Sequence, residues 1–91
     1  MRIEYISTPQ PRQITHLALN LRFTRAERDA IRTSSDADVQ DVLFLFDVAR
    51  YIDLDRVETV AGLNMLEAKG LLGAGRAQQI IEQQVEPHER P

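Results

Sequence analysis

The sequence predicts an all-α fold, a small bundle of four or five short helices with an extended N-terminal arm. Apolar residues recur at helical spacing along most of the chain, and helix-capping patterns separate these segments. With 91 residues, 43% of them hydrophobic, the chain suits one domain with a core. We expect an arm over residues 1–8, a helical domain over 9–85, and a polar tail over 86–91 without structure of its own.

Residues 12–23 have a pattern that fits either a strand or a helix. It is compatible with a strand, because alternate residues from Leu17 to Phe23 are apolar, and with a helix, because Ile14 and Leu21 fall on one helical face. Its Leu, Ala, Arg and Gln content favours a helix. We expect Thr8 to cap that helix and Pro9 to occupy its first position.

Two helices should follow. Thr24 and Glu27 have the spacing of a capping box and predict a helix to about Thr33. A second helix should run from about Asp36 to Tyr51. Apolar residues cover more than one of its faces, which is typical of a central helix surrounded by others.

The last two helices are bounded by acidic residues and glycines. Asp53–Asp55 reads as a connector, Asp55 as the cap of a helix to about Lys69, and Gly70 as its left-handed C-terminal residue. A final helix should span 74–84. The expected core residues are Leu43, Phe46, Leu63, Leu66, Ile80 and Ile81.

Nothing in the composition indicates an enzyme, a cofactor or a metal. The chain has no cysteine, and its two histidines, His16 and His88, are not at zinc-ligand spacing. The acidic residues of 53–58 could attract a hard cation, but they lack the glycine and third ligand position of a calcium loop, so we favour a connector and a helix cap. No segment is apolar enough for a membrane span, and the charged N-terminus is unlike a secretion signal. We therefore expect a non-enzymatic protein of the cytoplasm in the cell that makes it.

Charge is divided unevenly along the chain. Residues 1–32 carry six arginines against three acidic residues, and residues 33–91 carry five basic against eleven acidic residues. Arg25, Arg28 and Arg32 should form a stripe on one helical face, with Arg22 just before it. Such a stripe can be a solvated face, contact an acidic protein, or contact nucleic acid, in that order of preference.

The N-terminal arm is the other candidate contact. Residues 2–6 are too short for a stable sheet but could add a strand to the sheet edge of a partner, or fold back onto the chain's own helices. The partner-binding residues we expect are Ile3, Tyr5, Ile6, Arg22, Arg25, Arg28 and Arg32.

Residues 63–81 resemble a helix-hairpin-helix, whose turn amides bind DNA phosphates. Gly73 and Ala77 have the spacing of that motif, but two residues rather than one separate Gly70 from Gly73. The extra residue would misdirect the amides, so we expect a turn between packed helices. Nucleic acid is for this reason an unlikely partner. A small nucleic-acid-binding regulator, using the arginine stripe or this turn, remains the alternative function.

A wider resemblance rests on short motifs spread over about residues 14–81. They are Phe23-Thr24, Glu27, Ala30-Ile31, Tyr51-Ile52-Asp53-Leu54-Asp55, Thr59, Ala61-Gly62-Leu63, Leu66-Glu67-Ala68, Gly70-Leu71-Leu72 and Gly75-Arg76-Ala77. In these the chain resembles a group of small uncharacterised proteins encoded by tailed phages and prophages of GC-rich bacteria. The resemblance implies a phage structural or accessory protein without catalytic residues. Such a protein would bind a larger virion protein, perhaps of the tail, and would occur in the virion or the cytoplasm of the bacterial host.

Overall fold

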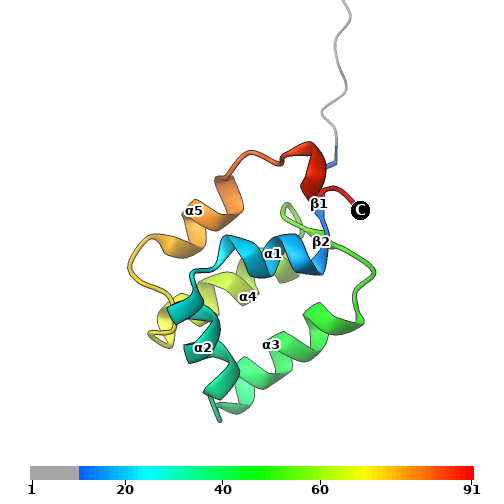
Figure 1. Cartoon of the computed structure of the whole chain (residues 1–91). Coiled ribbons are helices and arrows are strands. Elements are labelled where there is room, and N and C mark those ends of the chain that lie inside the picture. The colour runs from blue at the N-terminus through cyan, green and yellow to red at the C-terminus, as the bar shows by residue number, and fades with distance from the viewer. Residues whose placement is uncertain (1–10) are drawn as a thin grey trace, which may run out of the picture.

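The computed structural model describes residues 11–91. Figure 1 shows five helices packed around one another, with two very short strands beside α1. The predicted helical fold is confirmed. In chain order the elements are β1 (Gln13–Ile14), α1 (His16–Arg22), α2 (Arg25–Thr33), α3 (Ala37–Val48), β2 (Ile52–Asp53), α4 (Val57–Ala68), α5 (Arg76–Glu82) and a 3₁₀ turn, η1 (Pro87–Glu89).

The segment before α1 corrects the expected helix start. The described chain forms β1 before α1, and β1 pairs antiparallel with β2, Ile14 opposite Ile52. Both isoleucines are fully buried, which explains why this stretch is extended instead of helical. The residue that caps α1 is Thr15, whose hydroxyl accepts from the Ala18 amide at 3.0 Å. Thr8 and Pro9 lie outside the described residues.

The capping box of α2 is confirmed. The Glu27 amide donates to the Thr24 hydroxyl at 3.1 Å, and the Thr24 amide donates to the Glu27 carboxylate at 2.8 Å. The same carboxylate accepts two bonds of 2.8 Å from the Arg76 guanidinium, which lowers the pKa of Glu27. The cap therefore also ties α2 to the start of α5.

The expected start of α3 is confirmed, but its central position is wrong. The Asp36 side chain accepts from the amides of Asp38 and Val39, as a cap should. Of the helix residues, however, only Val39 is fully buried. α3 lies at the periphery, against α4, because the core is already filled by the other elements (Figure 1).

β2 replaces part of the expected connector, and α4 begins one residue later than Asp55 would require. The residue at the cap position is Arg56, which makes no side-chain capping bond. Asp53 instead accepts from the Asp55 amide at 3.0 Å within the turn. The expected cap at Asp55 is therefore wrong, because pairing with β1 fixes the chain upstream of the helix.

The end of α4 matches its expectation. Gly70 has a φ of +80°, and its amide donates to the Glu67 carbonyl, while the Leu71 amide donates to the Leu66 carbonyl. This pair of bonds is a Schellman motif, which reverses the chain towards α5.

The C-terminal tail is structured, contrary to expectation. Residues Pro87–Glu89 form η1, and the Glu89 carbonyl accepts from the Thr15 amide at 2.8 Å. The tail thus covers the junction of β1 and α1.

The core lies where the two strands meet α1, α4 and α5. Of the six expected core residues, Leu63, Leu66 and Ile80 are fully buried, while Leu43, Phe46 and Ile81 are half-buried and pack against the core. Gly62 allows α3 to approach α4 closely, because a Cβ there would lie 3.0 Å from Val42 and 3.1 Å from Phe46.

Candidate functional site

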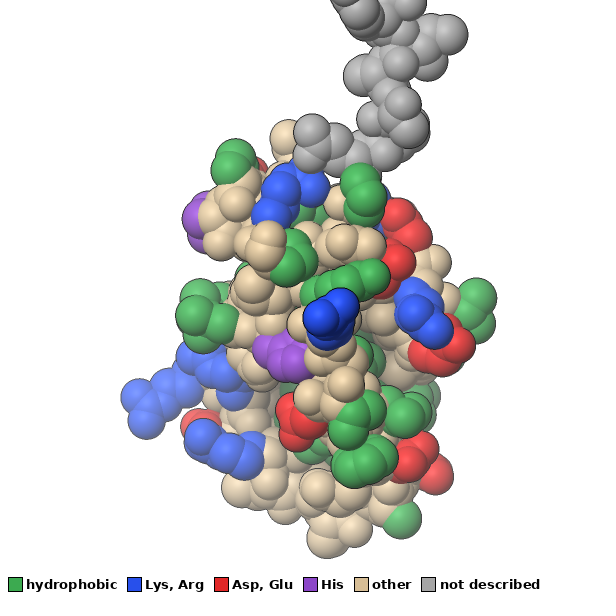
Figure 2. Space-filling model, turned by 90° about the vertical axis from the view of Figure 1, so that its right-hand side faces the viewer, with side chains coloured by type: hydrophobic (Ala, Val, Ile, Leu, Met, Phe, Trp, Pro, Cys, Tyr) green, Lys and Arg blue, Asp and Glu red, His purple; other side chains and the backbone are tan. Residues whose placement is uncertain are grey.

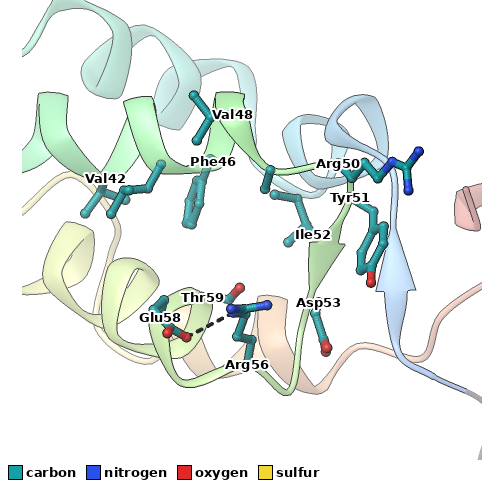
Figure 3. A pocket seen from close by; sticks show the side chains of 12 residues that line it. Val42, Phe46, Val48, Arg50, Tyr51, Ile52, Asp53, Arg56, Glu58 and Thr59 are labelled. Atoms are coloured by element: carbon teal, nitrogen blue, oxygen red, sulfur yellow. Dashed lines mark hydrogen bonds and ion pairs between the residues drawn. The ribbon is translucent and has the colours of Figure 1, made fainter.

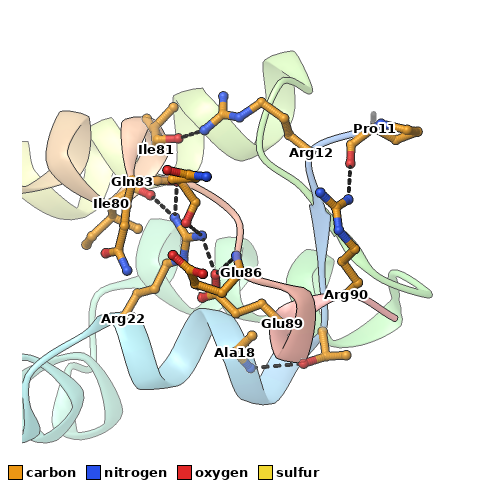
Figure 4. A network of polar contacts seen from close by, with 12 residues as sticks. Pro11, Arg12, Ala18, Arg22, Ile80, Ile81, Gln83, Glu86, Glu89 and Arg90 are labelled. Atoms are coloured by element: carbon orange, nitrogen blue, oxygen red, sulfur yellow. Dashed lines mark hydrogen bonds and ion pairs between the residues drawn. The ribbon is translucent and has the colours of Figure 1, made fainter. Parts of the chain in front are cut away.

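Arg22, one of the expected partner-binding residues, is buried inside the molecule. It is 7% exposed, and its guanidinium forms a two-pronged ion pair with the Glu89 carboxylate at 2.9 and 2.8 Å (Figure 4). It also donates to the carbonyls of Ile80 and Gln83, at the end of α5. The expectation that Arg22 belongs to an exposed contact surface is therefore wrong.

The other three arginines of the stripe have unequal roles. The Nη1 of Arg28 donates to the carbonyls of Asn20 and Phe23, at 3.0 and 2.8 Å, and so completes the C-terminal end of α1. Arg25 and Arg32 are 88% and 75% exposed at the side chain and share the carboxylate of Asp29. The solvent-facing stripe consists mainly of these two residues. Ile3, Tyr5 and Ile6 lie outside the described residues.

Two helices of the described chain each expose more than one large apolar side chain: α1, with Leu17 and Leu21, and the outer side of α3. Phe44, Leu45 and Val48 are 61%, 47% and 62% exposed, on successive turns of one helix. Phe44 and Val48 are four residues apart, so they share a face, and Leu45 is next to them around the helix. We call these three residues the α3 band. Figure 2 shows hydrophobic side chains gathered with acidic ones over the lower half of one face.

A groove adjoins the α3 band. It has a volume of about 500 Å³ and lies between the end of α3, β2 and the start of α4 (Figure 3). Its apolar wall includes Leu45 and Val48 of the band, together with Phe46 and Tyr51. The band and the groove therefore form one continuous apolar surface.

The polar side of the groove is mostly paired. Arg56 and Glu58 form an ion pair at 3.2 Å across its floor, where the backbone bond at Glu58 and the charge of Arg56 lower the pKa of Glu58. Arg50 and Asp53 complete the polar rim. These groups are exposed or on short connectors and no histidine lines the groove, so the arrangement suits binding better than proton transfer.

The glycine turn does not present free amides in the manner of a phosphate site. The amide of Ala77, in the first turn of α5, donates a hydrogen bond of 3.0 Å to the Glu67 carboxylate of α4. The positive end of α5 is therefore already compensated by a carboxylate of the chain itself.

Residues 11–91 contain neither a metal-ligating cluster nor a helix that could span a membrane. No cluster of three or more His, Asp or Glu side chains there could hold a metal ion. Asp53 and Glu58 make local bonds, and the Asp55 carboxylate pairs with Arg12 at 2.7 Å. No helix in the same part of the chain is long and apolar enough to cross a membrane.

Comparisons of the chain with protein-family models, with curated proteins and with solved structures find no match.

The α3 band was not predicted, because apolar residues on more than one face of this helix indicated a central helix surrounded by others. A signal was present in the charges. Asp41 and Asp47 interrupt the apolar run on the side that carries Phe44 and Val48, and an uncompensated carboxylate is costly inside a core. The helix therefore had to expose one side.

Proposed function

We propose that the chain is a non-enzymatic accessory protein that binds a larger protein through the α3 band and its groove. The observation that carries this proposal is the exposure of three large apolar side chains on one helix, continuous with a groove of about 500 Å³. Contiguous exposed apolar surface is typical of interaction sites, whereas isolated exposed apolar residues are ordinary.

The resemblance to small phage and prophage proteins suggests what the partner is. We propose a virion protein, with the tail as the first assembly to examine. The N-terminal arm, with Ile3, Tyr5 and Ile6, and the exposed Arg25 and Arg32 would then provide a second contact. A DNA-binding role has less support, because Arg22, Arg28 and the first turn of α5 are engaged within the chain.

The test is capture of virion proteins by the immobilised chain and by matched variants. Val48→Asp places a charge in the α3 band and should abolish capture. Leu17→Asp is the control, because Leu17 is 68% exposed on a different helix, α1. Capture that survives Val48→Asp but is lost with Leu17→Asp would place the contact on α1 and refute the proposal.

A chain lacking residues 2–8 tests the arm separately. If it folds and binds more weakly than the full chain, the arm is a contact. Binding at full strength would remove Ile3, Tyr5 and Ile6 from the proposed surface, and failure to fold would mean that the arm packs on its own helices.

A further inference from the structure

A second cavity lies on the other flank of α3, between α1, α2 and α3. Its volume is about 240 Å³. Its inner wall reaches the core, because Leu19, Phe23, Ile31 and Leu66 line it and are all buried. Protein interiors are close-packed, so an opening of this size into the core is an unusual feature of so small a domain.

The mouth of the cavity is polar and mainly basic. Arg28 and Arg32 lie one turn apart on α2 and both line it. Arg28 uses Nη1 to cap α1, and Arg32 uses Nη2 to contact Asp29, which leaves other N–H groups on each guanidinium for a ligand. Asp47, on the α3 wall, is the one acidic residue of the lining.

His16 adds a second, independent observation. It lines the cavity, and its Nε2 is buried with no hydrogen-bond partner among residues 11–91. Buried polar atoms are nearly always bonded, so an exception calls for a missing partner. An oxygen atom of a bound molecule would supply one.

We propose that this cavity binds a small organic carboxylate with one compact apolar group. A cavity of about 150 Å³ can hold benzene. The space here accommodates a ring and a short acidic substituent. The ring would occupy the wall formed by Leu19, Ile31 and Leu66, and the carboxylate would lie at the mouth, beside Arg32 and His16. This site shares Arg32 with the proposed second contact but includes no residue of the α3 band, so binding of a small molecule can be tested without the partner.

Phenylacetate and phenylacetamide are suitable probes, because they have nearly the same shape and differ in charge. Titration into the full chain, followed by nuclear magnetic resonance, should shift the signals of Leu19, Ile31 and Leu66. Phenylacetate should bind about three- to fivefold more tightly than the amide, the range of an exposed ion pair.

Two arginine variants provide a matched comparison. Arg32→Gln should weaken phenylacetate binding about three- to fivefold and leave phenylacetamide binding unchanged. Arg25→Gln is the control, because Arg25 also contacts Asp29 but does not line the cavity. Asp47→Asn should strengthen phenylacetate binding, because it removes the one like charge from the lining.

Leu43→Phe narrows the cavity from the α3 wall and should abolish binding of both probes. If neither probe binds, or if both bind equally and Arg32→Gln changes nothing, the proposal is wrong. Signals that shift away from the cavity lining would also overturn it. Arg32→Gln keeps the test decisive if the Leu43 variant does not fold.

Discussion

The junction of α1 with the C-terminal tail and the outer side of α3 are built in opposite ways. At the junction, the charged groups of Arg22 and Glu89 are buried and each is bonded on several sides (Figure 4). On α3, large apolar side chains remain in water. The junction joins distant segments through buried charges, which are costly to desolvate. The outer side of α3 keeps an apolar surface exposed, which a partner could cover. The comparison indicates that the junction stabilises the fold, whereas the outer side of α3 contributes little to stability and carries the proposed contact.

The largest expected effect is at the junction. Arg22→Leu would leave the Glu89 carboxylate buried without its partner, and should lower the free energy of unfolding by about 3–5 kcal/mol. Arg25→Leu is the control and should change it by less than about 0.5 kcal/mol, because Arg25 is on the surface. Urea denaturation measures both. If both variants lowered the free energy of unfolding equally, the buried ion pair of Arg22 would not contribute more to stability than the exposed Arg25.

The next prediction compares two phenylalanines of α3. Phe46→Ala should cost about 2 kcal/mol, less than a fully buried phenylalanine, because Phe46 is half-buried against Gly62 and the core. Phe44→Ala should cost less than about 0.5 kcal/mol, since Phe44 is mostly exposed. Thermal and urea unfolding would show the difference. A larger cost at Phe44 than at Phe46 would mean that α3 packs against α4 with Phe44, and not Phe46, on its inner face.

The junction should contribute to the pH dependence of stability, together with Glu27, whose pKa is lowered by Arg76. Arg22 lowers the pKa of Glu89 in the folded chain, so the carboxylate stabilises the fold above its unfolded pKa, about 4.3. This stabilisation should be lost as pH falls through the lower folded pKa. Glu89→Gln removes the charge but keeps an acceptor beside Arg22, so it should cost less than Arg22→Leu, about 1.5–3 kcal/mol at pH 7, and flatten the acid limb of a stability profile. An acid limb identical to that of the unmodified chain would assign the acid sensitivity to other carboxylates, such as Glu27.

The smallest effect should be at the outer end of α3. Lys69 contacts Asp36 and Asp38 at 3.0 and 3.3 Å, which lowers the pKa of Asp36, but all three groups are partly or largely in water. Lys69→Met should destabilise the chain only slightly, and added salt should remove the difference. The Arg22→Leu effect should persist in salt because that pair is buried. Salt that erased both effects would contradict the contrast between the two regions.

Features set by neighbouring residues could be predicted from the sequence. The capping box at Thr24, the Asp36 cap and the turn at Gly70 each depend on residues within a few positions of one another, and all three are confirmed. The pairing of Ile14 with Ile52 and of Arg22 with Glu89 joins segments far apart in the chain. No local pattern specifies such partners, which explains why β1 and the ordered tail were missed.

The candidate surface was predictable only in part. The sequence identifies the apolar residues of α3, but periodicity alone does not say whether other helices cover every apolar face. In this chain the elements that could have covered Phe44 and Val48 are already committed to the core around Leu63 and Leu66. The prediction that Arg22 lies on the surface was wrong because its partner, Glu89, belongs to a tail that the sequence predicts to be unstructured.

The ion pair between Arg22 and Glu89 also constrains how the chain folds while it is being synthesised. The two residues are 67 positions apart, so α1 leaves the ribosome long before its partner exists. Until residue 89 has emerged, the guanidinium of Arg22 lacks the carboxylate that neutralises it. Formation of the native state should therefore wait until residue 89 has emerged, and ribosome-bound chains stalled before that point should be far more sensitive to protease than chains stalled after it.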